Sequence, residues 1–458
     1  MALSESTVWE VRGADGNDLN GAGFNATRDA VNGVDYSQQA AAQLSLTDLA
    51  CASNTTLTSV TGGFTHAMEG NLVYIASGTN ALAGFYEITV YTNTNTVTID
   101  RTCATGGNMT AGVGKVGGAA ATPGMIGAVV VRGNTIYCKG DQTIAYATSN
   151  VSGGCINSSI SCVFIGYATT RSFNNSNTRP IFTVNAGVTG ATIFTGTYIG
   201  VSTLSLNGAG VAASCGVGSA GFVYRCHLAN FTNGGISIPY SGVVFCTATG
   251  CSSAAALNGN AVFCEAYNNS YAGFGTSGSY AFCISSGNTT SNGHGFISDG
   301  GRFSAFCIAY GNAGTGFLSN AATSSRVFIN CIAESNSGYG WYYPTSSDYG
   351  INKLFINCAH YNNTSGSGLT GSYSFQIGTI AITAGSVFTD AAAGDFSLNN
   401  TANCGALLRS VGFPVLFPRG LTANYLDVGA ARHADPAGGS GVRDMTTGIM
   451  RGMAGMLK

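Results

Sequence analysis

The sequence predicts an all-β chain. Its main part is a right-handed parallel β-helix (a solenoid of stacked coils), preceded by a small antiparallel β-unit and followed by a short tail. Composition is the first observation: 67 of the 458 residues are glycine, 45% are hydrophobic and only 8% are charged. Disordered chains have few apolar residues and high net charge, so this chain is expected to bury a core. The second observation is a cysteine-centred repeat, and the third is a series of short strands separated by Gly, Ser and Asn turns.

The repeat becomes visible when the chain is aligned on seven cysteines. The gaps between them are 20, 18, 19, 24, 24 and 27 residues, which is the length of one solenoid coil with loop insertions that grow toward the C-terminus. The same residue types recur at the same offsets from each cysteine. This constancy favours a stack of equivalent parallel strands rather than a series of antiparallel hairpins. The cysteines are Cys226, Cys246, Cys264, Cys283, Cys307, Cys331 and Cys358.

Two columns of the repeat are predicted to be internal. Strand alternation places the residues two before and two after each cysteine on the same face as the cysteine, which we expect to be the packed interior. Reduced, buried thiols are the favoured state, although neighbouring cysteines in such a stack also lie within disulfide reach.

Asparagine tolerates left-handed backbone and can bond to its copy one coil away, which predicts an asparagine ladder at a tight turn. The ladder residues are Asn269, Asn288, Asn312, Asn336 and Asn363.

Aromatic residues are predicted to form an outward column. Phenylalanine stands just before four of the cysteines and asparagine before the next two, while tyrosine stands three residues after three of them. An outward aromatic stripe usually marks an interface. Three interpretations remain open: packing between subunits of a homotrimer, which we favour, stacking on sugars, or cover by a loop of the same chain. The residues are Phe245, Phe263, Phe282, Phe306, Tyr267, Tyr310 and Tyr361.

The flanking segments suggest four parts. We predict an N-terminal segment over 1–125, the β-helix over 126–400, a cap over 401–436, and a linker with a possible docking tail over 437–458, although a frayed terminus explains that tail equally well.

Finer features are expected within the flanks. Strong alternation over 54–100 predicts the antiparallel β-unit, residues 37–50 suggest a short helix, and 102–124 is interpreted as a glycine-rich connector. The stretches YSFQIGTIAIT and SVFTD, after the last repeat cysteine, are expected to close the solenoid.

Several classes of partner are excluded by composition. A net charge of −2 argues against nucleic acid as a main partner, because phosphate binding needs clustered Lys and Arg. No apolar run reaches the length of a membrane span, and the stretch MALSESTVWEV does not resemble a signal peptide. The cysteine spacing lacks paired CxxC blocks and acidic clusters are absent, so neither a metal nor a cofactor is expected.

Three stretches resemble a known group of proteins. VFIGYATTRSFNNSNTRPIF (163–182), GDFSLNNTANCGALLRSVGFP (394–414) and YLDVGAARHADP (425–436) are similar to pectate-lyase-like β-helix proteins of bacteriophages and environmental bacteria. The resemblance implies the β-helix fold and, by analogy, a trimer. The group contains polysaccharide lyases, tailspike depolymerases, adhesins and structural virion parts, so the fold alone does not select an activity.

Catalytic candidates are weak. Polysaccharide cleavage needs two nearby carboxylates, or a carboxylate with Arg or Lys, in a surface groove. Asp299, Arg302 and His294 share one loop region and form the best set, and Glu334 is a further candidate. A solvated loop charge is the favoured explanation for each of them, so an enzyme is not the favoured interpretation.

The sequence therefore favours a structural or adhesion protein of a phage virion. A tail spike or fibre, or a head-decorating spike, used for attachment to the host surface, fits the aromatic stripe and the scarcity of acids. We expect a homotrimer that contacts other virion proteins, with host surface polysaccharide as a further candidate partner. It is expected to be made in the host cytoplasm and carried on the virion. The alternatives are a polysaccharide depolymerase (a glycosidase or lyase acting on host glycan) and a secreted or cell-surface location.

Overall fold

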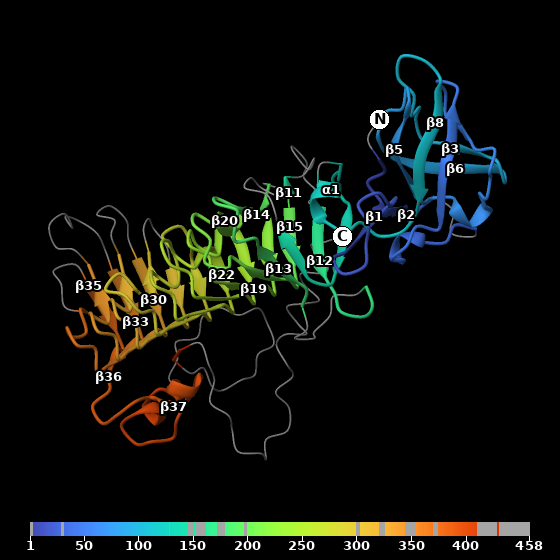
Figure 1. The fold of residues 1–458 in the computed structure, drawn as a ribbon. Coiled ribbons are helices and arrows are strands. Elements are labelled where there is room, and N and C mark those ends of the chain that lie inside the picture. The colour runs from blue at the N-terminus through green and yellow to red at the C-terminus, as the bar shows by residue number, and fades with distance from the viewer. Residues whose placement is uncertain are drawn as a thin grey trace.

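The chain forms an elongated rod of stacked coils with a small barrel near its N-terminus (Figure 1). This computed structural model describes residues 3–28, 32–127, 129–144, 151–152, 162–171, 179–196, 199–298, 303–319, 326–343, 353–369, 374–409 and 428–429. The predicted linker and docking tail over 437–458 lie outside these residues. No helix in the described part of the chain is long and apolar enough to cross a membrane.

Two long parallel sheets and one short one build the rod, which confirms the predicted parallel β-helix. The first sheet carries the strand before each repeat cysteine and the second carries the strand after it. The first contains β1 (Thr7–Arg12), β9 (Thr135–Lys139), β12 (Cys162–Gly166), β15 (Ile199–Ser202), β18 (Phe222–Tyr224), β20 (Ile236–Val244), β22 (Leu257–Val262), β24 (Tyr280–Ala281), β27 (Phe303–Ala305), β30 (Arg326–Ile329), β33 (Lys353–Ile356) and β35 (Ser374–Ile377), with β2 (Gly23–Asn25) antiparallel to β1.

The remaining strands complete each coil. The second sheet contains β10 (Gln142–Ile144), β13 (Ile181–Val184), β16 (Ser205–Asn207), β19 (His227–Ala229), β21 (Thr247–Thr249), β23 (Glu265–Tyr267), β25 (Ile284–Ser286), β28 (Ile308–Tyr310), β31 (Ile332–Glu334), β34 (Ala359–Tyr361) and β36 (Ile380–Ala381). The short sheet contains β26 (Phe296–Ile297), β29 (Phe317–Leu318) and β32 (Trp341–Tyr342). Three further strands precede it on the same side and pair onward to β20: β11 (Val151–Ser152), β14 (Thr192–Thr195) and β17 (Cys215–Ser219).

The corner between the first two sheets is a single left-handed residue in each coil. Phe245, Phe263, Phe282 and Phe306 all have φ of 54°, and Asn330 has φ of 53°. Such a residue interrupts the in-out alternation of a strand. The interior residue before the corner is therefore three positions ahead of the cysteine, and this column is buried in every repeat: Val223, Val243, Ala261, Tyr280, Ser304, Phe328 and Phe355.

One predicted column is consequently wrong. The residues two before the cysteine are only partly buried in five of the seven coils, for example Val244 and Val262, because the corner turns them away from the interior. The residues two positions after each cysteine lie beyond the corner, and their predicted interior position is confirmed in six of the seven coils. They are buried from Leu228 to Ala333, and only His360 is partly exposed.

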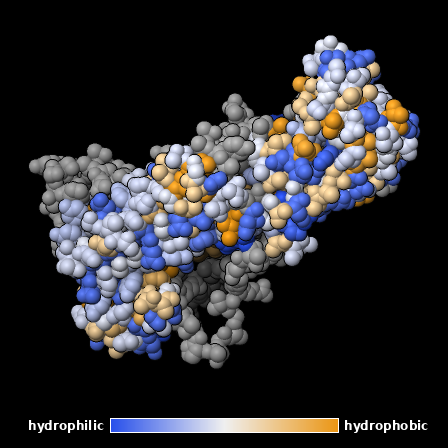
Figure 2. Space-filling model, in the orientation of Figure 1, coloured by the Kyte–Doolittle hydropathy of each residue, from blue (hydrophilic) through white to orange (hydrophobic). Residues whose placement is uncertain are grey.

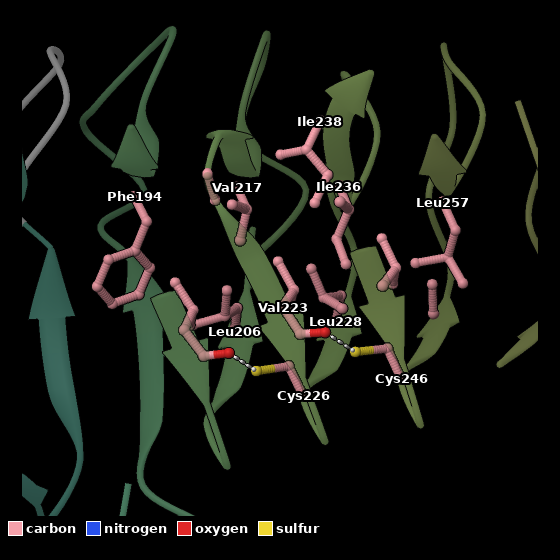
Figure 3. Close-up of a cluster of buried hydrophobic side chains, with 14 of the residues drawn as sticks. Phe194, Leu206, Val217, Val223, Cys226, Leu228, Ile236, Ile238, Cys246 and Leu257 are labelled. Atoms are coloured by element: carbon pink, nitrogen blue, oxygen red, sulfur yellow. Dashed lines mark hydrogen bonds between the residues drawn. The ribbon is translucent and has the colours of Figure 1, made fainter. Parts of the chain in front are cut away.

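The seven repeat cysteines line the interior as free, buried thiols. Each thiol donates to a carbonyl of the preceding coil or of its own strand: Cys246 Sγ lies 3.6 Å from the Val223 oxygen, and Cys226 Sγ lies 3.7 Å from the Val201 oxygen (Figure 3). Burial raises the pKa of Cys226 and Cys246 well above the usual thiol value, which keeps these donors protonated.

An asparagine ladder closes the next turn. The Asn288 amide donates to the Asn312 carbonyl at 2.7 Å, Asn312 donates to Asn336 at 2.9 Å, and Asn336 donates to Asn363 at 2.8 Å. The left-handed residue at this turn is not the ladder asparagine, as the sequence suggested, but the residue before it, such as Asn268 with φ of 54°. That corner turns the following side chain inward, where it bonds along the axis.

Aromatic rings fill the interior beside the short sheet. Phe274, Phe296, Phe317 and Trp341 stack face to face in successive coils, with ring centroids 4.6, 4.9 and 5.3 Å apart. Burial of these rings and of the cysteine column forms one continuous core along the rod.

The predicted antiparallel unit is a closed barrel, larger than expected. It consists of β3 (Leu44–Cys51), β4 (Thr56–Thr58), β5 (Leu72–Thr79), β6 (Gly84–Asn93), β7 (Thr96–Ile99) and β8 (Met109–Val116), with its own core.

Two expectations in this region are wrong. Residues 37–50 contain only the one-turn η1 (Tyr36–Gln38) before β3, because the alternating apolar residues of 44–51 face the barrel core. The expected connector contains β8, which closes the barrel between β3 and β5. Two other short helices are η2 (His66–Met68) in this region and α1 (Pro123–Gly127) after it.

A buried ion-pair network joins the N-terminal segment to the rod. Strand β1 pairs in parallel with β9 and thereby extends the first sheet. Its Glu10 is fully buried and accepts bonds from the Tyr167 hydroxyl and from Arg171, whose Nε lies 2.7 Å from the carboxylate. Arg171 also pairs with Asp35 at 2.5 Å. Burial raises the pKa of Glu10, and the charge of Arg171 opposes that shift.

The C-terminal hairpin unit, residues 386–409 with 428–429, leaves the solenoid. It contains β37 (Phe388–Asp390), η3 (Ala391–Ala393), β38 (Asp395–Leu398) and η4 (Gly405–Leu407), and β37 pairs with β38 in antiparallel fashion. YSFQIGTIAIT supplies the last solenoid strands as predicted, but SVFTD does not close the rod. It folds back because Phe388 packs against residues of the second sheet.

We predict that Asn312→Ala destabilises the rod by about 3 kcal/mol, because it leaves buried donors of Asn288 without their acceptor. Urea unfolding followed by circular dichroism measures the change. Asn363→Ala, at the partly exposed end of the ladder, is the comparison variant: it also removes an acceptor, that of Asn336, but water can reach this end of the ladder, so it should cost less than half as much. Equal losses at the two positions would contradict an energetic role for the ladder.

We predict that Arg171→Met destabilises the chain by about 3–5 kcal/mol at pH 7, because two carboxylates would then lack their cation in a largely buried site. Arg132→Met removes an exposed ion pair with Glu5 and serves as the control, with a loss below about 1 kcal/mol. Thermal unfolding distinguishes the two, and a similar melting temperature for both variants would refute the expectation.

Candidate functional site

The predicted catalytic set is not assembled in the described residues. Asp299 and Arg302 lie outside them. His294 follows the asparagine ladder, and its Nδ1 accepts a hydrogen bond from the Thr315 backbone at 2.9 Å. Burial lowers the pKa of His294, so the ring is neutral and its acceptor nitrogen is already used to position the next coil.

Glu334, the other candidate, does not face an open groove. Its register partners in the second sheet are Tyr310 and Tyr361. The C-terminal hairpin unit covers it, and the Val387 amide donates to Oε2 at 3.1 Å. The side chain is 1% exposed, which places the carboxyl out of reach of a polymer substrate while the unit is docked.

The phenylalanine column is an outer ladder along the corner. Phe245, Phe263, Phe282 and Phe306 stack with centroids 5.1, 5.0 and 4.7 Å apart and planes within 18° of parallel. The first three are partly buried and Phe306 is buried. Each ring face within the stack is covered by its neighbour, so the free surface consists of ring edges. This geometry disfavours sugar stacking, which uses ring faces.

The tyrosine column is divided between two environments. Tyr310 and Tyr361 pack against the C-terminal hairpin unit, with the Tyr310 ring 5.6 Å from the Phe396 ring. A segment of the same chain therefore covers Tyr310 and Tyr361, which was one of the three interpretations of the aromatic stripe. Tyr267, two coils earlier, is partly buried and does not join that cluster.

The outer face of the second sheet changes character along the rod. The first outward position of each strand is Ser205, His227, Thr247 and Glu265 in succession, and then Ile284, Ile308 and Ile332. His227 Nδ1 lies 2.7 Å from the Thr247 hydroxyl. Burial and the charge of Arg179 lower the pKa of His227, and burial raises the pKa of Glu265. The polar stretch thus ends where the hairpin unit begins.

A hollow of about 260 Å³ lies beside the start of this polar stretch. Strand ends from both long sheets and the loop after β1 line it. Its charged lining residues are Arg12, Lys139, Arg179, Asp15 and Asp141, and Tyr167 contributes an aromatic wall. Three cations and two carboxylates thus line one hollow, which offers a polar ligand charged groups of both signs.

The two carboxylates of the hollow have partners. Asp15 pairs with Arg12 at 2.9 Å, and Asp141 accepts a hydrogen bond from the Ile181 amide at 2.8 Å. Within the described residues neither Lys139 nor Arg179 forms an ion pair. The hollow therefore presents excess positive charge and suits a carboxylate-bearing or otherwise anionic ligand.

Sequence reasoning missed this hollow because its residues are far apart in the chain. Arg12 and Lys139 meet only through the register of β1 with β9, and Arg179 follows a long insertion. The pairing of the N-terminal strand with the first coil has no signal in the repeat. No group of three or more metal-ligating side chains occurs in the part of the chain that the structure describes.

Comparisons with known proteins concern only the architecture. No protein-family model and no curated protein matches the chain. Among solved structures, pectate lyase Pel9A has a TM-score of 0.45 and 17% identity over 69% of this chain and 92% of the lyase. ORF18 of Geobacillus virus E2 has a TM-score of 0.31 and 12% identity, covering 54% of this chain and 52% of that one.

A further structure is the catalytic domain of a GH87 alpha-1,3-glucanase, with a TM-score of 0.27 and 12% identity over 73% of this chain and 90% of that domain. Likenesses at this level carry no information about activity, and the function has to be inferred from this chain's own residues.

Proposed function

We propose that the chain is a structural or adhesion protein of a phage virion, a homotrimeric β-helix that attaches to the host surface. The virion is its proposed location, with a secreted or cell-surface location as the alternative. The single observation that carries the proposal is the phenylalanine ladder on the outer corner. It runs along four coils, and its first three rings leave their edges at the surface.

The ladder uses phenylalanine where the backbone disfavours it. A side chain other than Gly or Asn in left-handed backbone costs about 1–3 kcal/mol. Later coils avoid this cost with Asn330, Asn357 and Gly378 at the same corner. Stacking returns about 0.5–1.5 kcal/mol per ring pair, which offsets the strain only in part. We infer that the rings are kept for a contact with another molecule.

A second copy of the chain is the partner that best fits these ring edges. The stripe follows the long axis of the rod, so parallel copies related by a threefold axis could align their stripes over several coils. On the face shown in Figure 2, strongly hydrophobic residues form small separate patches among polar ones. The low overall charge also avoids repulsion between parallel rods.

We predict that the wild-type chain has three times the 46.4 kDa chain mass in solution and that Phe245→Asn with Phe263→Asn is a monomer. Asparagine fits the left-handed corner, so the variant should fold, with a loss of less than about 2 kcal/mol. Light scattering after size exclusion measures the mass.

Phe375→Asn is the matched control, because Phe375 is 65% exposed but lies outside the ladder. It should leave the trimer intact. A monomeric wild-type chain, or a trimeric double variant, would contradict subunit packing through the ladder.

The second candidate function is a polysaccharide depolymerase, a glycosidase or lyase acting on host glycan. The hollow favours it, because Asp15 and Asp141 lie there beside basic side chains, and such pairs serve as acid and base in sugar cleavage.

If the depolymerase function is correct, Asp141→Asn should lower product release from a cleaved polysaccharide by about a hundredfold or more. Asp395→Asn, an exposed carboxylate of the C-terminal hairpin unit, should have no effect. Release of reducing or unsaturated ends from a panel of bacterial surface polysaccharides is the assay. Binding to a polysaccharide without any release would support adhesion, and release that Asp141→Asn does not change would exclude the hollow as the reaction site.

A further inference from the structure

We propose that the C-terminal hairpin unit is a proton-controlled cover on the second sheet, docked when Glu334 is protonated and loosened when Glu334 ionises. This regulation is independent of the proposed function, since it concerns only which part of the sheet is accessible. It rests on an apolar contact face, one isolated buried carboxyl group, and the charges around that group.

The second sheet and the C-terminal hairpin unit meet through an apolar contact face. Ile308, Ile332 and Ala359 of the second sheet form one buried cluster with Val387, Phe388, Phe396, Leu398, Leu408 and Val428 of the unit. The Gly429 amide donates to the Asn330 carbonyl at 2.7 Å, so the unit also ends on the corner column. Without the unit, Ile308 and Ile332 would be exposed to water, and burial of this apolar surface drives docking.

One carboxyl group is trapped in this contact. Glu334 Oε2 accepts the Val387 amide, whereas Oε1 is buried and has no hydrogen-bond partner. A buried carboxylate oxygen without a partner is unfavourable, whereas a protonated carboxyl carries no charge into the apolar contact. The contact therefore fits the neutral acid better than the anion.

Among the residues that the structure describes, no cation compensates the carboxyl group. On its own sheet Glu334 faces Tyr310 and Tyr361, and the nearby His360 is kept neutral because burial lowers its pKa. The unit adds two acids, Asp390 near the Tyr310 hydroxyl and the exposed Asp395.

The one base of the unit in this region is directed elsewhere. Arg409 bonds to the Leu398 carbonyl at 2.6 Å and to the Asn400 side chain at 3.3 Å. The thiol of the unit, Cys404, is buried and free. Within the described part of the chain, ionised Glu334 would thus have only acids and neutral groups around it.

The sign of the pH dependence follows from the shift. Burial raises the pKa of Glu334, and the hydrogen bond from the Val387 amide and the nearby Ser386 hydroxyl reduce that shift in part. Release of the unit returns the group to its ordinary value. Docking is therefore fully stabilised below the ordinary pKa and weakens as pH rises through the raised pKa. Above that raised pKa no further weakening comes from this group, and between the two values the opening constant rises up to tenfold per pH unit.

Hydrogen exchange of the full chain tests the proposal. Mass spectrometry of peptides from 387–408, normalised for intrinsic exchange, should show an opening constant that rises with pH between 4 and 8. In Glu334→Gln this rise should disappear, because the replacement cannot ionise. Glu265→Gln is the matched control on the same sheet, away from the unit, and should keep the wild-type slope.

Thiol labelling of Cys404 provides a second measurement that compares variants at one pH. At pH 7.5, Cys404 should react several-fold more slowly in Glu334→Gln than in the wild type, while the core cysteines remain unreactive in both. If glutamine prevents docking altogether, labelling would be fast but still without a pH-dependent opening constant. A flat wild-type profile, or a variant with the wild-type slope, would overturn the proposal.

Discussion

The left-handed residue before each repeat cysteine is the constraint on which the rest of the solenoid depends. A coil has to turn sharply between its first and second sheets, and one residue with φ near 54° makes that turn. This residue directs the cysteine inward, leaves carbonyl groups within reach of its thiol, and directs its own side chain outward. The thiol column and the phenylalanine ladder are therefore two consequences of one backbone feature. A second left-handed corner does the same for the asparagine ladder.

The outer face of the second sheet connects the fold with function. Its early coils carry polar side chains beside a hollow with excess positive charge, and its late coils carry isoleucines beneath the C-terminal hairpin unit. The same sheet positions thus form an accessible polar surface at one end and a covered apolar surface at the other. The aromatic ladder lies along the edge of both. In the function that we propose, the corner serves assembly and the early coils contact a ligand, so no catalytic groove along the rod is needed.

The repeat allowed much of the architecture to be predicted, and the errors have a common physical origin. Constant offsets identified coil length, the cysteine column and the asparagine column, because stacked coils impose the same environment on equivalent residues. Alternation failed at Val244 and its equivalents, since a left-handed residue changes the direction of the chain without any change in residue spacing. The prediction of a short helix over residues 37–50 is wrong because the sequence does not show that the apolar residues of 44–51 pack against barrel partners.

The sequence by itself determined the solenoid, the interior position of its thiols and the outward position of its aromatic residues. Local spacing contains that information, because every coil repeats the same short-range choices. Only the tertiary structure decided which surfaces remain accessible. The pairing of β1 with β9 assembled the hollow from Arg12, Lys139 and Arg179, and the folding back of the hairpin unit buried Glu334. Both depend on contacts between segments far apart in the chain, for which the repeat contains no pattern.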